Sequence, residues 1–190
     1  MNRETWLISA SEKLGDLLAQ ETGEHAPQVR VSVGFPKGRG GKKFKAIGQC
    51  WSGACAEDGL SQVFIHPELA DAVRVLDVLL HEIIHATVGT ECGHKGAFKQ
   101  VALAVGLTGK MTATEAGETL KPRLEAIAQE LGDYPHSALN SEAGGGKKQG
   151  TRLIKCECED CGYVVRTTAK WLEALGPVFC PCNNESMTIG

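Results

Sequence analysis

The cysteines of this chain are placed unevenly, and that placement limits how its last part can fold. Five of the eight cysteines lie within the last 35 residues: Cys156, Cys158, Cys161, Cys180 and Cys182. Residues 151–190 are too few to bury an apolar core that would keep them folded unaided. Because the first residues lack the basic-then-apolar layout of a secretion signal, we expect a cytoplasmic protein, in which disulfides are rare. The clustering therefore indicates a metal site.

Two close cysteine pairs supply a ligand set for that site. Cys158 and Cys161 form one pair, Cys180 and Cys182 form the other, and 18 residues separate the pairs. Four thiolates close a tetrahedral site against water, so we expect a structural Zn²⁺ in a small zinc ribbon. Cys156 competes with Cys158 for one position. We favour Cys158, because its CxxC spacing presents a metal knuckle better than the CxC spacing that Cys156 would use.

The composition divides the chain into two domains. Residues 137–150 are rich in glycine, lysine and small polar residues, as expected of a flexible linker. We therefore predict a domain over residues 1–136, this linker, and the zinc ribbon over residues 151–190.

Hydrophobic periodicity predicts an α+β fold for the first domain. Apolar residues recur at helical spacing in several segments, and Gly or Pro residues bound them. The predicted helices cover residues 3–21, 71–88, 96–106 and a segment from Pro122 to Gly132. Thr112 and Glu115 have the spacing of a capping box at a helix start. Three short apolar runs, over residues 29–33, 46–51 and 62–66, predict a small antiparallel sheet.

The predicted helix over residues 71–88 carries an HExxH pattern. It consists of His81 and His85, with Glu82 directly after the first histidine. Residues four apart lie on one face of a helix, so both imidazoles can reach one ion while Glu82 flanks the open coordination position. The simpler alternative is a pair of histidines that only pack or face solvent on an amphipathic helix. The helical context favours a catalytic zinc site.

A catalytic zinc site needs a third protein ligand, with water in the fourth position. We favour His94, nine residues after His85 and at the start of the next predicted helix. Glu91 occupies the position where a metzincin has its third histidine, so that pattern fails here. Glu115 or Glu118 remains an alternative ligand, through a carboxylate.

The chemistry expected of such a site is peptide hydrolysis. Glu82 would act as the general base toward the attacking water. A donor for the oxyanion is not evident from the sequence. Tyr134 is the one tyrosine in the first domain, and a packing role is favoured for it over a catalytic one.

Several motifs together resemble the SprT-like zinc metalloproteins, of the SprT and Spartan type. They are the run Leu79 to Ala86 around HExxH, the run His94-Lys95-Gly96-Ala97-Phe98, and the C-terminal cysteine ribbon. The resemblance covers residues 5–110 and 151–182, roughly. It implies a minimal zincin-like metallopeptidase domain, Zn²⁺ on His81, His85 and His94, and Glu82 as catalytic base.

The distribution of charge along the chain indicates where it could contact nucleic acid. The formal net charge is −3, so a generally basic nucleic-acid binder is excluded. A local basic segment exists before the HExxH helix, and Trp51 follows it with a ring that could stack on a base. Its basic residues are Lys37, Arg39, Lys42, Lys43 and Lys45. A solvated loop with Trp51 in the core is the alternative. No apolar run is long enough for a membrane span.

Two functional hypotheses follow. The first is a zinc metalloendopeptidase with one catalytic and one structural Zn²⁺, acting on protein substrates associated with DNA or with nucleoprotein. The second is a non-catalytic zinc-binding adaptor associated with DNA or transcription. An adaptor has no need of Glu82, so the intact HExxH pattern favours the peptidase.

Overall fold

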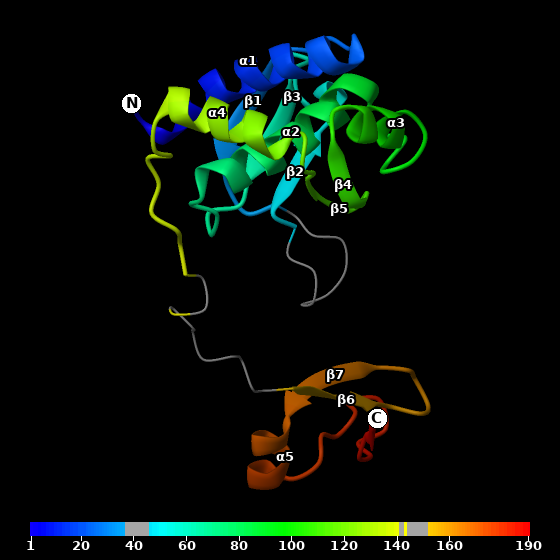
Figure 1. Cartoon of the computed structure of the whole chain (residues 1–190). Helices are drawn as coiled ribbons and strands as arrows, with labels where there is room; N and C mark the ends of the chain where they lie inside the picture. Colours follow the sequence, from blue (N-terminus) through cyan, green and yellow to red (C-terminus); the bar gives the residue numbers. More distant parts are fainter. Residues whose placement is uncertain (37–45, 141–142, 144–151) are drawn as a thin grey trace. The chain divides into compact units, whose positions relative to one another are not determined.

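A computed structural model of the chain describes residues 1–36, 46–140, 143 and 152–190. The chain divides into two compact units, Met1–Ser141 and Glu142–Gly190, and its fold is mixed α+β (Figure 1). Most of the predicted linker, at residues 141–142 and 144–150, lies outside the described residues. No helix among the described residues is long and apolar enough to cross a bilayer.

The first unit contains four α-helices and five strands in its described part. In chain order they are α1 (Arg3–Thr22), β1 (Val29–Val33), β2 (Gly48–Trp51), β3 (Ser61–Ile65), α2 (Ala72–Val88), α3 (Ala97–Ala104), β4 (Leu107–Lys110), β5 (Ala113–Ala116) and α4 (Lys121–Leu131), with a 3-10 turn η1 (Gly53–Cys55) before β3. α1 begins where the Asn2 side chain accepts a hydrogen bond from the Thr5 amide (2.8 Å), and it ends at Gly23 in the left-handed conformation.

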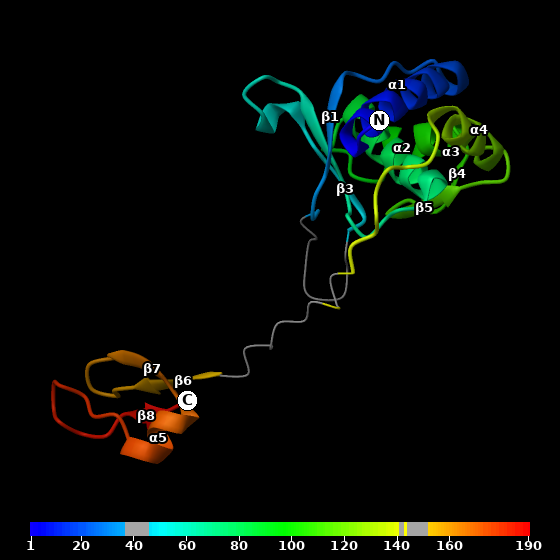
Figure 2. The same ribbon diagram turned by 90° about the vertical axis from the view of Figure 1, so that its left-hand side faces the viewer.

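The main sheet has the order β1-β3-β2, with helices on one face (Figure 2). β2 runs antiparallel to β3, but β1 runs parallel to β3. The sheet is therefore mixed, and the prediction of an antiparallel sheet was wrong. Alternation of apolar residues indicates which side chains face the core, and Val31 and Val63 are buried as paired neighbours. The alternation carries no information about the direction of the neighbouring strand.

α2 lies at the centre of the first unit and packs against α1, α3, α4 and the sheet. Asp71 caps it through its side chain, which accepts a hydrogen bond from the Arg74 amide at 2.7 Å. Ten of its residues are buried, in agreement with the apolar stripe in the sequence. Each large aliphatic side chain in this core contributes about 1.5–3 kcal/mol by burial. The HExxH segment is therefore on the most firmly packed helix of the unit.

Residues 107–116 form a hairpin rather than the helix start that the capping-box spacing of Thr112 and Glu115 predicted. β4 and β5 pair antiparallel, with Gly109 opposite Thr114. Gly106 precedes β4 with φ of 98°, a conformation that ends α3 and turns the chain into the hairpin. The helix after it, α4, covers Lys121–Leu131 with Gly132 as its C-cap, within one residue of the predicted segment from Pro122 to Gly132.

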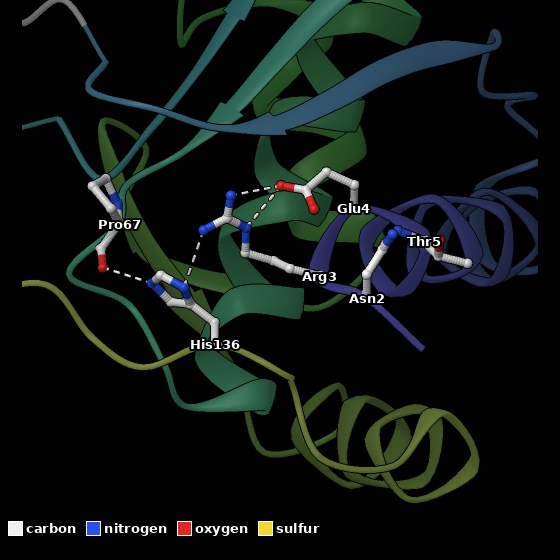
Figure 3. Close-up of polar contacts among 6 residues, drawn as sticks. All are labelled: Asn2, Arg3, Glu4, Thr5, Pro67 and His136. Atoms are coloured by element: carbon white, nitrogen blue, oxygen red, sulfur yellow. Dashed lines mark hydrogen bonds and ion pairs between the residues drawn. The ribbon is translucent and has the colours of Figure 1, made fainter.

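The segment after α4 returns across the first unit. The Trp6 indole donates a hydrogen bond to the Gly132 carbonyl (3.0 Å), and the ring packs against Tyr134. His136 has a polar contact at each ring nitrogen (Figure 3). Its Nδ1 atom lies 3.3 Å from Nη1 of Arg3, and its Nε2 atom donates a hydrogen bond to the Pro67 carbonyl at 2.8 Å. The Leu139 amide also donates to Pro67, at 2.8 Å. This contact attaches part of the segment predicted as linker to the first unit.

The second unit is a small antiparallel sheet with a short helix. Its elements are β6 (Leu153–Glu157), β7 (Val164–Thr168), α5 (Ala169–Leu175) and β8 (Thr188–Ile189), and the strand order is β7-β6-β8. Its buried residues are Cys156, Cys158, Cys180 and Met187. Because three of these four are cysteines, the apolar core is too small to explain how the unit folds.

Candidate metal centres

Three histidines of the first unit converge on one point. The Nε2 atom of His94 lies 3.2 Å from Nε2 of His81 and 3.2 Å from Nε2 of His85. One ligand atom from each residue lies within 4.8 Å of the other two. The group could therefore hold a metal ion.

His94 reaches this point because the chain turns back after α2. α2 ends at Gly89, and His94 lies in the turn that leads to α3. Gly93 and Gly96, on either side of His94, have φ values of 54° and 51°. Such values suit glycine, and they allow the reversal that brings His94 over the HExxH face.

The distances fit a tetrahedral zinc ion. Zn–N bonds of about 2.0–2.1 Å at tetrahedral angles put the nitrogen atoms about 3.3 Å apart. The two measured separations of 3.2 Å are close to that value. Burial lowers the pKa of His81 to about 3 and that of His85 to about 4, and it also lowers the pKa of His94. The three imidazoles are thus neutral at pH 7, as ligands must be.

Phe98 of α3 supports the three imidazoles from behind. Its side chain is fully buried, and its ring is stacked on His85 with centroids 4.2 Å apart. The ring centroids of His81 and His94 lie 4.8 and 5.1 Å from that of Phe98. This apolar support restricts the rotation of the three rings and excludes water from one side of the centre.

Glu82 is buried between α2 and the edge strand β2. Burial raises the pKa of Glu82 to about 8, and a backbone hydrogen bond from Cys50 to the carboxylate opposes this shift only in part. Gly48 provides the space for this side chain. A Cβ atom at position 48 would lie 2.6 Å from Oε1 of Glu82. A bound cation nearby would favour the ionised carboxylate.

The second unit carries a four-cysteine cluster. Sγ of Cys180 lies 3.3 Å from that of Cys182 and 3.5 Å from that of Cys161, and the Cys158–Cys182 separation is 3.7 Å. Zn–S bonds of about 2.3 Å predict sulfur atoms about 3.8 Å apart. These four cysteines could hold a second metal ion. Cys156 is buried on β6 and does not belong to the cluster.

The remaining candidate residues lie elsewhere. Glu115 and Glu118 are exposed, and neither belongs to the histidine group. Tyr134 packs against Trp6 and has a buried hydroxyl. Trp51, at the end of β2, is 39% exposed, so it is not a core residue. The predicted nucleic-acid residues Lys37, Arg39, Lys42, Lys43 and Lys45 lie outside the described residues.

Sequence reasoning missed two residues at the histidine centre. Thr114 of β5 lies 2.8 Å from His81 through its Oγ1 atom. The capping-box spacing of its neighbours Thr112 and Glu115 predicts a helix start there, so no sequence signal points to the strand that carries Thr114. Gly48 gave no signal either, since its role depends on a close approach between distant segments.

Comparison with models of protein families, with curated proteins and with solved structures gave no match. The function proposed below therefore depends on the sequence motif and on the geometry of the two clusters.

Proposed function

We propose that the protein is a zinc-dependent metalloendopeptidase of the SprT-like type, with a zincin-like catalytic domain and a C-terminal zinc ribbon. One observation carries the proposal: the imidazoles of His81 and His85 on α2 and of His94 in the following turn converge at zinc-ligand spacing, and Glu82 directly follows the first of them. Three neutral nitrogen ligands leave a fourth coordination position open, which is typical of catalytic rather than structural zinc.

The residues of the chain have separate tasks in this reaction. His81, His85 and His94 would hold the ion, and Phe98 would keep their rings in place. Zinc bound there supplies Lewis acidity toward a peptide carbonyl and lowers the pKa of a bound water. Glu82 accepts a proton from the attacking water at its carboxylate and returns it to the leaving amine nitrogen, as the peptide C–N bond breaks.

The position of β2 supports a peptide substrate. Within the described part of the chain, β2 pairs only with β3, so it is an edge strand of the main sheet. The same strand contacts α2 and places Gly48 against Glu82. An extended peptide can add to such an edge through backbone hydrogen bonds. Added there, the peptide would run beside the proposed general base.

The ribbon and the basic segment carry the second part of the proposal. We propose that the substrates are proteins associated with DNA or held in nucleoprotein complexes. Residues 151–190 contain four basic and five acidic residues, so the ribbon alone attracts nucleic acid weakly. The five basic residues of the 37–45 segment are the electrostatic candidates for phosphate contact.

The decisive experiment compares the wild-type protein with Glu82→Gln, in the full chain, with and without single-stranded DNA. Glutamine keeps the size of the side chain but cannot accept the proton. We expect cleavage of a protein substrate, or of the chain itself, to be lost in the variant while both zinc ions remain bound. Equal cleavage by the two proteins would contradict the mechanism.

The same experiment addresses the adaptor hypothesis. A non-catalytic adaptor predicts no Glu82-dependent cleavage in either condition. It also predicts salt-sensitive DNA binding that is lost when Lys42, Lys43 and Lys45 are replaced by glutamine. A cleavage activity that depends on Glu82 excludes it.

A further inference from the structure

The hydrogen bond between His81 and Thr114 assigns a tautomer to the first ligand. The Nε2 atom of His81 faces His94, so this is the atom available to a metal ion. Its Nδ1 atom then carries the ring proton, and it lies 2.8 Å from Oγ1 of Thr114. The imidazole therefore donates to the threonine hydroxyl. Thr114 is buried, 6% exposed, so water competes weakly for this bond.

The three ligands are oriented in different ways. Among the described residues, the buried Nδ1 atom of His85 has no hydrogen-bond partner, and the ring is held by stacking on Phe98. His81 has the hydroxyl of Thr114 as its partner. An aromatic stack restrains the plane of a ring, whereas a hydrogen bond also selects which nitrogen is protonated.

Thr114 is itself anchored to α2. The Arg74 guanidinium lies 3.4 Å from the Thr114 carbonyl oxygen and forms an ion pair with the buried Asp77. Arg74 and Asp77 lie on the same helix as His81, in the two turns before it. The contact joins β5 to the helix that carries the first ligand. The hydroxyl of Thr114 is thus held at a set distance from the ring that it meets.

We propose that Thr114 is a positioning residue for His81, and that its hydroxyl raises the affinity of the histidine centre for zinc. The inference rests on the proposed metallopeptidase site. A hydrogen-bond partner of a histidine ligand orients the ring and increases its basicity, and loss of such a partner typically lowers metal affinity about 10- to 100-fold.

The test uses the full chain and three variants. Thr114→Val keeps the shape of the side chain and removes the hydroxyl, and Thr114→Ser keeps the hydroxyl. Thr108→Val is the matched control, because Thr108 is on the same hairpin and its hydroxyl donates to the Glu115 carbonyl (3.2 Å) rather than to a histidine. Zinc affinity is measured by competition with a chromophoric chelator. Cobalt substitution separates the two sites, because only the cysteine site gives sulfur-to-cobalt charge-transfer absorption.

The expected result is a zinc affinity of the histidine site about 10- to 100-fold lower in Thr114→Val, within about threefold of wild type in Thr114→Ser, and unchanged in Thr108→Val. The cysteine site should be unaffected in all three. Unchanged affinity in Thr114→Val, or an equal loss in Thr114→Ser or Thr108→Val, would overturn the inference.

A second measurement covers the case in which Thr114→Val does not fold. Nitrogen NMR of the imidazoles in the zinc-loaded wild-type chain should show a protonated, slowly exchanging Nδ1 atom in His81. A metal ion on Nε2 leaves Nδ1 protonated with or without a partner, so the slow exchange is the informative result. An Nδ1 proton that exchanges with water as fast as that of an exposed imidazole would overturn the inference. Neither measurement requires cleavage, so the result is separate from that of Glu82→Gln. Intact Glu82-dependent cleavage with unchanged zinc affinity in Thr114→Val would refute the positioning role alone.

Discussion

Gly48 of β2 lies so close to Glu82 of α2 that a Cβ atom at position 48 would be 2.6 Å from Oε1 of the carboxylate. The same atom would lie 2.6 Å from Cγ1 of Val78. The two side chains come from adjacent turns of α2, and they leave room only for a hydrogen atom on the strand. The close packing of the edge strand β2 against the proposed general base Glu82 therefore requires glycine at position 48.

Gly48→Ala should impair cleavage through displacement of Glu82. The added methyl group must push the carboxylate aside, and a shift of about 1 Å in a reacting group can reduce the rate about 100-fold. We expect kcat to fall while zinc binding persists, at a stability cost of about 1–3 kcal/mol. Kinetics and urea unfolding measure the two effects.

Gly15→Ala is the control for that substitution. A Cβ atom at position 15, on α1, would meet only Cβ of Ala26, at an ordinary 3.5 Å. Alanine within a helix is favoured over glycine by about 0.5–1 kcal/mol, so this variant should be as active as wild type and slightly more stable. Equal activity of Gly48→Ala and Gly15→Ala would contradict the role given to Gly48.

Cys158→Ser should remove the metal from the second unit. A backbone hydrogen bond from Cys161 lowers the pKa of the Cys158 thiol to about 7, which favours the thiolate that a metal requires. Because the unit has a small apolar core, loss of the ion should also remove hydrogen-exchange protection from β6 and β7. Metal analysis should show one equivalent fewer than in wild type.

Cys156→Ala is the matched variant, since Cys156 is buried outside the cluster. It should keep both metal equivalents and cost about 1 kcal/mol of packing. Loss of one equivalent in Cys156→Ala, with none lost in Cys158→Ser, would assign the ligand to Cys156.

Stability should fall at high pH because of Tyr134. Burial raises the pKa of its hydroxyl from 10.0 to about 12, with Arg3 lowering it and Glu4 raising it to smaller extents. The native state therefore keeps its proton where the unfolded state releases it, and stability is lost as the pH rises from about 10 to 12. At about 1.4 kcal/mol per pKa unit, a shift of two units sets an upper limit of about 2.7 kcal/mol on the stability lost once the pH has passed 12. Urea unfolding at pH 9 and pH 11, under reducing conditions, measures this loss of unfolding free energy.

Tyr134→Phe isolates that contribution. Phenylalanine retains the contact with Trp6 but has no ionisable hydroxyl. The difference in unfolding free energy between wild type and variant should change by about 1 kcal/mol between the two pH values, because pH 11 lies only part of the way between the two pKa values. A constant difference would mean that Tyr134 ionises equally in both states.

Local patterns predicted the elements that carry the histidine centre. α1, α2 and α4 end within a residue or two of their predicted bounds, because periodicity, caps and glycine stops all depend on near neighbours. The sequence patterns did not predict the hairpin β4–β5, because its strands have four residues each and show no clear apolar alternation. They did not predict the parallel pairing of β1 with β3 either, because that pairing joins segments about thirty residues apart.

The sequence by itself determined that His81 and His85 share a helix face with Glu82 beside them, since helical spacing sets those relations over four residues. It also determined that residues 151–190 need more than an apolar core. Only the tertiary structure decided that His94 meets the first two histidines, that Thr114 meets His81 from 33 residues away, and that Gly48 lies against Glu82. These contacts come from packing of α2 against the turn before α3, the hairpin and the edge strand. Long-range packing of this kind leaves no periodic trace in either of the segments that it joins.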